Sequence, residues 1–207
     1  APPVSEGGPE GQIVFSDIGK LDTALQSDIV NLVKLMLEKK TYKLAVNKKG
    51  ESKYSPRAKF TGKFALQVWN AVAGIGCGSD KKFPGFKACQ NIAAKAQVKD
   101  IYNPLKKATF IKKDFKLNKK VARAEHYEIL LKARGISVDT NSNKASDLKT
   151  ECPDMKKPTD KWAKVFFTAK KNGIAVSDIN KKKKGNQCGL TLVFTRDEAA
   201  FAAMRAV

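Results

Sequence analysis

The sequence has no long apolar run. No stretch approaches the ~20 residues that a membrane-spanning helix needs, so we predict no membrane span. Hydrophobic residues nevertheless make up 42% of the 207 residues, and aromatic residues 8%. This composition is too apolar for a disordered basic tail and is typical of one globular domain or two small ones.

Histidine is nearly absent, since His126 is the only one. A Ser-His-Asp or Cys-His mechanism would have to use this residue, which lies on the apolar stripe of a predicted helix. A buried structural histidine is therefore the expected role. The glycine-rich stretch at 74–82 follows a predicted helix and lacks the spacing of known nucleotide-binding loops. We predict no enzymatic activity and no cofactor.

Paired cysteine motifs are also missing. The cysteines Cys77, Cys89, Cys152 and Cys188 contain no Cys-x-x-Cys pair, and with one histidine in the chain we predict no metal site. Two disulfides, Cys77 with Cys89 and Cys152 with Cys188, fit the spacing about as well as four free thiols do. Disulfides would indicate a lumenal or secreted protein, and free thiols an intracellular or virion protein.

Arginine is scarce although the chain is strongly basic. Of the 40 basic residues only Arg57, Arg123, Arg134, Arg196 and Arg205 are arginine, and the formal net charge is +20. Such a charge attracts polyanions. Lysine acts as a hydrated point charge rather than a bidentate reader of bases, so the bias favours sequence-independent backbone contact. An A/T-rich genome would produce the same bias.

Apolar periodicity and capping residues predict a mainly helical α+β fold. The clearest stripe consists of Ile29, Leu32, Val33, Met36 and Leu37, in a helix capped by Ser27. Further helices are predicted at 59–73, 86–98, 119–134 and 159–173, and from a capping box formed by Thr195 and Glu198 to the end.

Two short β-hairpins with lysine-rich tips complete the predicted fold. The first joins runs at 42–46 and 51–54 through a turn that ends at Gly50. The second joins runs at 174–179 and 189–194 through a turn at 180–186. We predict four segments: a flexible arm (1–15), a main helical domain with a hairpin (16–138), a linker or long loop (139–158) and a C-terminal helix-hairpin-helix segment (159–207).

The densest basic region lies at 104–120. If Thr109 to Leu117 is a strand, Phe110, Lys112 and Lys116 share one face, which offers a ring for base stacking beside two ammonium groups. The alternative is that Phe110 is buried and the lysines form a solvated surface. Together with the two hairpin tips, this region supplies the predicted nucleic-acid-binding residues: Lys48, Lys49, Lys106, Lys107, Phe110, Lys112, Lys113, Lys116, Lys181, Lys182, Lys183 and Lys184.

The sequence therefore predicts a non-enzymatic, largely sequence-independent nucleic-acid-binding structural protein. We expect it to act as a coat, nucleoprotein or ribonucleoprotein scaffold within a larger assembly, with RNA or DNA as its polyanion partner. The alternative is a basic extrinsic docking subunit of a larger protein complex in an oxidising compartment. Its lysines would then bind an acidic protein or lipid surface.

Overall fold

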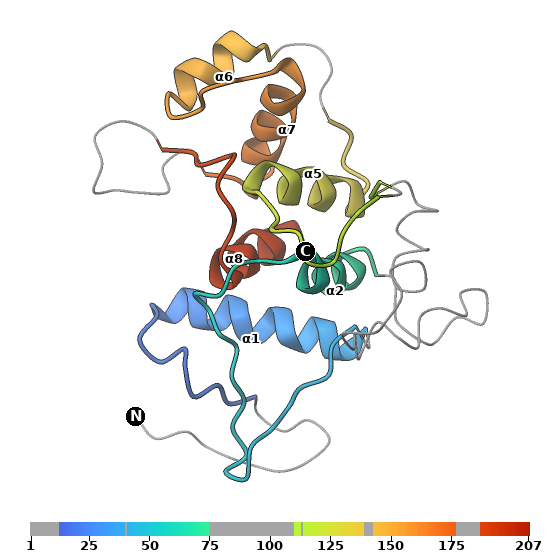
Figure 1. Ribbon diagram of the computed structural model, residues 1–207, viewed down its shortest axis with the longest axis vertical. Coiled ribbons are helices and arrows are strands. Elements are labelled where there is room, and N and C mark those ends of the chain that lie inside the picture. Colours follow the sequence, from blue (N-terminus) through green and yellow to red (C-terminus); the bar gives the residue numbers. More distant parts are fainter. Residues whose placement is uncertain (1–12, 40, 75–109, 113, 139–142, 177–186) are drawn as a thin grey trace, which may run out of the picture.

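The computed structural model describes residues 13–39, 41–74, 110–112, 114–138, 143–176 and 187–207 (Figure 1). Helices dominate this part of the chain. They are α1 (Thr23–Glu38), α2 (Gly62–Val72), α5 (Arg123–Ala133), α6 (Ala145–Glu151), α7 (Asp160–Lys171) and α8 (Arg196–Ala206).

Three of these helices begin in the same way. The helices α2, α5 and α8 each have 11 residues, and each follows an N-cap residue in extended conformation. One position before each N-cap, a large apolar side chain is buried: Phe60, Val121 and Phe194. We call these repeated structures, at 58–72, 119–133 and 192–206, the three units.

The backbones of the three units form a closed ring of hydrogen bonds. The amide of Phe60 donates to the carbonyl of Phe194 at 2.8 Å, the amide of Phe194 to Val121 at 3.1 Å, and the amide of Val121 to Phe60 at 2.9 Å. Isolated bridges flank this ring and join Lys59 with Thr195, Thr61 with Lys120, and Ala122 with Val193. The units are therefore arranged with approximate threefold symmetry.

This ring also explains how the helices begin. The first two amides of α2, on Gly62 and Lys63, donate to the carbonyls of Lys119 and Leu117, both at 2.8 Å. The first two amides of α5 and α8 likewise donate to carbonyls at the start of the next unit or just before it. These amides would otherwise lack partners. Neighbouring backbone thus substitutes for a side-chain cap, and neither Thr61 nor Ala122 makes one.

The inner faces of the three units share one core. Ala65, His126 and Ala199 occupy the same helical position in the three units, and all have 0% exposure. In Figure 1, α1 packs along α8 and α2 on one side of the units, while α7 packs on α5 and α6 on α7 at the other side. The buried apolar residues form a single cluster across these layers.

The predicted α+β class with two β-hairpins is wrong. All regular elements among the described residues are helices, and the only paired extended segments there make isolated bridges. The turn at 47–50 does form, with Gly50 at φ 77° and the Asn47 side chain accepting the amides of Lys49 and Glu51. Its flanking runs do not pair as strands.

The second predicted hairpin fails for a different reason. Its tip lies outside the described residues, but its second run, 189–194, is described. That run carries Val193, which bridges to Ala122, and Phe194, which hydrogen-bonds to Phe60 and Val121. The backbone groups expected to pair with a neighbour in sequence are satisfied by distant units instead.

Most of the helices follow the apolar pattern. The stripe of α1 is buried at Ile29, Leu32, Val33 and Met36, although the helix begins earlier than predicted and is capped by Asp22 instead of Ser27. Thr159 caps α7, and Thr195 with Glu198 forms the predicted capping box of α8. The predicted helix at 86–98 lies outside the described residues.

The stretch at 139–158, expected to be a linker or long loop, contains the short helix α6. The chain after α7 returns to the core, because α8 packs against α1. The proposed domain boundaries themselves remain a prediction. Among the helices of the described ranges, none is both long and apolar enough to cross a membrane.

Candidate nucleic-acid interface

Most arginine side chains make contacts that hold the fold together. Arg123 is 5% exposed, and its guanidinium lies 4.4 Å from the centre of the Phe194 ring and pairs with Glu198. The Arg196 guanidinium lies 4.6 Å from the centre of the Phe64 ring. Planar guanidinium groups suit such stacked, partly buried positions better than ammonium groups do.

Two further arginines pair with carboxylates. Arg57 contacts the buried carboxylate of Asp197 at 3.2 Å, and Arg205 contacts Asp28 at 2.9 Å. Acidic residues of α1 and α8 are thereby neutralised within the fold. The positive charge that remains at the surface is therefore carried mainly by lysine.

A cluster of lysines gathers where the first two units meet. The segments 59–63 and 112–120 run side by side, joined by the Thr61–Lys120 bridge and by the Lys63 amide on the Leu117 carbonyl. We call their lysines the basic face: Lys59, Lys63, Lys112, Lys116, Lys119 and Lys120. All are exposed except Lys119, which is half-buried.

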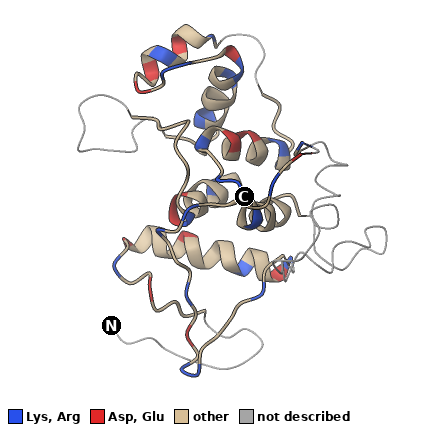
Figure 2. Ribbon diagram, viewed as in Figure 1, with Lys and Arg blue, Asp and Glu red and all other residues tan. Residues whose placement is uncertain are grey.

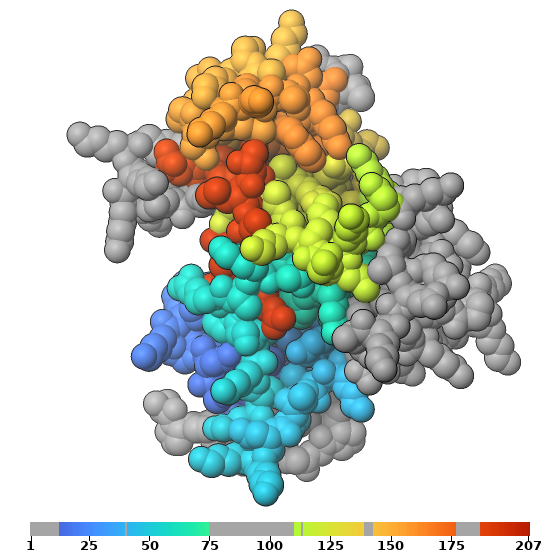
Figure 3. All heavy atoms as spheres, viewed as in Figure 1, coloured from blue at the N-terminus to red at the C-terminus, as the bar shows by residue number. Residues whose placement is uncertain are grey.

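The basic face is poorly neutralised by nearby acids. Figure 2 shows the basic residues along these segments, and in Figure 3 the teal and yellow-green segments adjoin on the visible side of the molecule. The same segments contain only Asp114 as an acid, and Lys119 pairs with Glu125 of α5 at 2.5 Å. Excess positive charge at this surface attracts anions.

A hollow of about 420 Å³ opens beside the basic face, between residues 110–119, α5 and α7. Glu128 lines it with only 16% of its side chain exposed, and accepts hydrogen bonds from Lys132 at 3.0 Å and Lys161 at 2.9 Å. Partial burial raises the pKa of Glu128, but the two ammonium groups outweigh burial, so the pKa lies below its usual value. These three side chains therefore form an ionised network.

Three of the predicted site residues come together at this hollow. Phe110, Lys112 and Lys116 all line it. Phe110 is half-buried and both lysines are exposed, whereas Ile111 and Phe115 are buried. The predicted alternation of facing is thus present for these residues, although the segment does not form the predicted strand.

The other predicted lysines lie elsewhere. Lys48 and Lys49 are exposed at the turn at the bottom of Figure 1, beyond α1 and away from the hollow. The remaining predicted positions fall outside the described residues: Lys106, Lys107, Lys113, Lys181, Lys182, Lys183 and Lys184.

Sequence reasoning did not select several residues of this surface. Lys59 and Lys63 are isolated in sequence, and Lys132 and Lys161 lie on helices far from the basic region. A Phe-Thr dipeptide begins the first and third units, at 60–61 and 194–195, but it recurs inside α7 and is replaced by Val-Ala in the second unit, so it gave no usable signal. Only the structure shows that Lys59 and Lys120 occupy one equivalent position.

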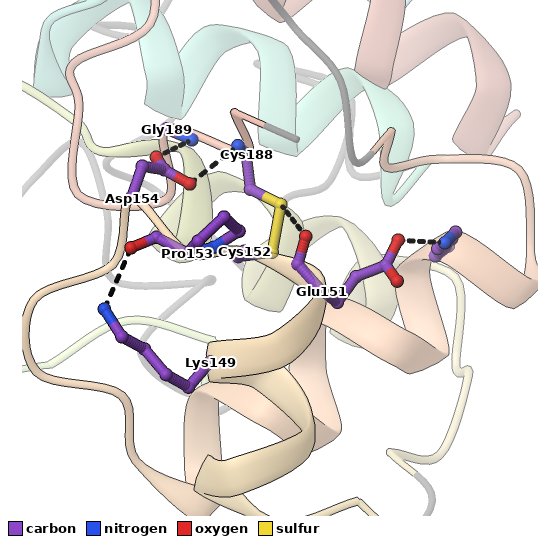
Figure 4. The surroundings of a disulfide bond; sticks show 8 residues. Lys149, Glu151, Cys152, Pro153, Asp154, Cys188 and Gly189 are labelled. Carbon is purple, nitrogen blue, oxygen red and sulfur yellow. Dashed lines mark hydrogen bonds and ion pairs between the residues drawn. A yellow bond between two sulfur atoms is a disulfide. The ribbon is translucent and has the colours of Figure 1, made fainter. Parts of the chain in front are cut away.

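A disulfide joins Cys152, at the end of α6, to Cys188 (Figure 4). Both residues are fully buried. The carboxylate of Asp154 accepts the amides of Cys188 at 3.0 Å and Gly189 at 2.8 Å, so the same junction is held by hydrogen bonds. The connection ties the α6–α7 layer to the segment that leads into α8. Cys77 and Cys89 lie outside the described residues.

The sole histidine is held inside the fold. Trp69 donates from Nε1 to Nδ1 of His126 at 2.9 Å, and Nε2 of His126 lies 3.2 Å from the Ala199 carbonyl. Nδ1 must accept, so Nε2 carries the proton and the ring is neutral. Burial lowers the pKa of His126 to about 3. This geometry matches a structural histidine and leaves neither ring nitrogen for an external substrate.

No protein-family model matches this chain, and a search of curated proteins finds no significantly similar sequence. Within the described residues, no group of three or more His, Cys, Asp or Glu side chains is placed to hold a metal ion.

Proposed function

We propose that this protein binds the sugar-phosphate backbone of RNA or DNA and acts as a non-enzymatic structural component of a nucleoprotein assembly. The observation that supports this most strongly is the basic face, where two segments distant in sequence bring six lysines against few acids. Ammonium groups on flexible stems contact phosphate without reading base edges. The binding is therefore expected to be largely sequence-independent.

Lysines crowded on one surface repel one another, and this cost is relieved when phosphates replace the diffuse counterions. Each phosphate neutralised on a single strand contributes a slope of roughly −0.7 in log affinity against log salt. Phosphates bound by most of the basic face would therefore give a slope of roughly −3 to −4.

The test is binding of a labelled single-stranded RNA across a salt series, with heparin as competitor. We expect a steep salt dependence and a preference for RNA over heparin at equal charge. Replacing Lys59, Lys63, Lys116 and Lys120 by Glu should weaken binding to all RNA sequences alike. A matched control makes the same change to Glu at four lysines that are exposed elsewhere: Lys20, Lys34, Lys156 and Lys157.

Two results would contradict the proposal. One is that heparin competes as well as RNA does, because the lysines would then form a generic cationic surface. The other is that the control variant loses as much affinity as the basic-face variant, because total charge rather than this surface would then determine binding.

One observation favours a second candidate, a basic docking subunit in an oxidising compartment. The buried Cys152–Cys188 disulfide is typical of lumenal and secreted proteins. In this candidate the basic face binds an acidic protein or lipid surface. This candidate would be favoured if a free-thiol assay on denatured protein from its native source detected no free thiol, and if RNA bound weakly and no better than heparin. Free Cys152 and Cys188 thiols would count against it.

A further inference from the structure

The hollow beside the basic face has two electrostatically different parts. Around Glu128 the charges are partly paired, because its carboxylate lies between the ammonium groups of Lys132 and Lys161. Lys112 and Lys116 line the hollow beside Asp114; both lysines are exposed, and neither has an ion-pair partner among the described residues. An anionic group is therefore attracted most strongly to Lys112 and Lys116.

An aromatic ring lines the same hollow. Phe110 lines the hollow, and it is half-buried and packs against the hydrophobic core. A partly exposed ring beside unpaired ammonium groups is the combination that binds single-stranded nucleic acids, because the ring stacks on a base while the cations contact phosphate. The volume of about 420 Å³ lies within the range of small-molecule pockets.

The lining around Glu128 can accept the edge of a base. The carboxylates of Glu125 and Glu128 lie there among the ammonium groups of Lys119, Lys132 and Lys161. The edge of a nucleobase carries both hydrogen-bond donors and acceptors. It therefore complements a surface that offers carboxylate acceptors and ammonium donors together.

We propose that the hollow binds one unstacked nucleotide of a single strand, with its base against Phe110 and its phosphate at Lys112 and Lys116. This inference rests on the proposed nucleic-acid function and makes it more specific. Bases of a duplex are paired and stacked, so they do not enter such a site. The protein should therefore prefer single strands to duplexes of equal charge.

The experiment compares two single-stranded DNA probes of equal length and charge, one with thymine bases throughout and one with abasic sugars throughout. Wild-type protein should bind the base-bearing probe at least about fivefold more tightly at fixed salt, the low end of what base stacking contributes. Phe110→Leu should lower the ratio of the two affinities to about one, whereas Phe110→Trp should retain the preference for the base-bearing probe. Thermal unfolding of each variant shows whether the fold is kept.

The outcomes separate this inference from the function on which it rests. If both probes bind equally and with steep salt dependence, the nucleotide site is disproved while backbone binding stands. The nucleotide site is also disproved if Phe110→Leu folds but loses affinity for both probes by the same factor. If neither probe binds in a salt-dependent manner, the proposed function itself fails.

Discussion

In the three units built around α2, α5 and α8, the inward-facing positions are alike, whereas the outward-facing positions differ. Phe60, Val121 and Phe194 are all buried at the same position and share one hydrogen-bonded ring. One residue earlier, on the outer side, the equivalent residues are Lys59, Lys120 and Val193. The common backbone thus fixes the core, and the surface of the first two units alone carries the lysines.

The third unit differs because its acids belong to the fold. Asp197 pairs with Arg57, and Glu198 pairs with Arg123. The second pair joins the third unit to the second, and the first pair joins the third unit to the residue just before the first unit. The comparison indicates that arginine and acid residues hold the units together, while lysine is placed where it contributes little to folding and is available to a partner.

The largest expected effect concerns His126 at the inner position. Its pKa is lowered to about 3 by burial, so protonation favours the unfolded state, in which the ordinary value is about 6.5. The stabilisation is complete above pH 6.5 and is lost as pH falls towards 3. We expect the free energy of unfolding to decrease by about 1.4 kcal/mol per pH unit, or about 4 kcal/mol by pH 3.5.

Urea unfolding between pH 7.5 and 5 measures this effect before most carboxylates titrate. The control is His126→Gln, which keeps a polar side chain at this position without a titrating group. The variant should show a nearly flat profile over this range. An equal slope in both proteins would mean that other groups cause the acid sensitivity.

The next largest effect is expected at a position where the residues of the first two units differ in size. The first helical residue is Gly62 in the first unit and Arg123 in the second. A Cβ on Gly62 would lie 2.4 Å from the Lys116 carbonyl oxygen. Gly62→Ala should therefore destabilise the protein by about 1–3 kcal/mol.

Gly19→Ala is the matched control, because a Cβ there meets nothing within 4 Å. Thermal or urea unfolding of both variants gives the comparison. If Gly62→Ala is as stable as the control, the backbone at Gly62 does not lie as close to the Lys116 carbonyl as described.

A smaller effect is expected when a buried arginine is replaced by lysine. Arg123→Lys keeps the charge but removes the planar group over Phe194 and the geometry of the pair with Glu198. We expect a decrease of about 1–2 kcal/mol in unfolding free energy. The reverse change on the outer surface, Lys59→Arg, should alter stability by less than about 0.5 kcal/mol. If the two substitutions changed the unfolding free energy equally, buried arginine would stabilise the fold no more than surface lysine does.

The smallest effect on stability should come from the basic face itself. Replacing Lys59, Lys63, Lys116 and Lys120 by Gln removes mutually repelling charges from exposed positions. The free energy of unfolding should stay within about 0.5 kcal/mol of wild type or rise slightly. Urea unfolding at low salt checks this expectation. A large decrease in stability would show that these lysines serve the fold.

Local patterns predicted those elements whose partners are local. The stripe of α1 and the capping box of α8 depend on residues a few positions apart, and both formed. The predicted starts of α2 and α5 were a few residues too early, because their first amides are satisfied by carbonyls of distant segments. The second hairpin failed for the same reason, since Phe194 of its second run hydrogen-bonds to the distant Phe60 and Val121.

Some residues of the candidate site were also predictable from local sequence, and others were not. Phe110, Lys112 and Lys116 were predictable because aromatic and basic residues alternate within one short stretch. Lys63 was not, because it reaches the basic face only through the pairing of its amide with Leu117. Such a pairing has no signature within a short stretch of sequence.

The most direct test of the central claim is the salt dependence of single-stranded RNA binding by two proteins, the wild type and the variant with Lys59, Lys63, Lys116 and Lys120 changed to Gln. If these lysines bind phosphate, the slope of log affinity against log salt should become shallower by roughly 3 in the variant, because each phosphate neutralised by a lysine accounts for about 0.7 of the slope. An unchanged slope in the folded variant would show that RNA binds elsewhere and would contradict the assignment of this surface.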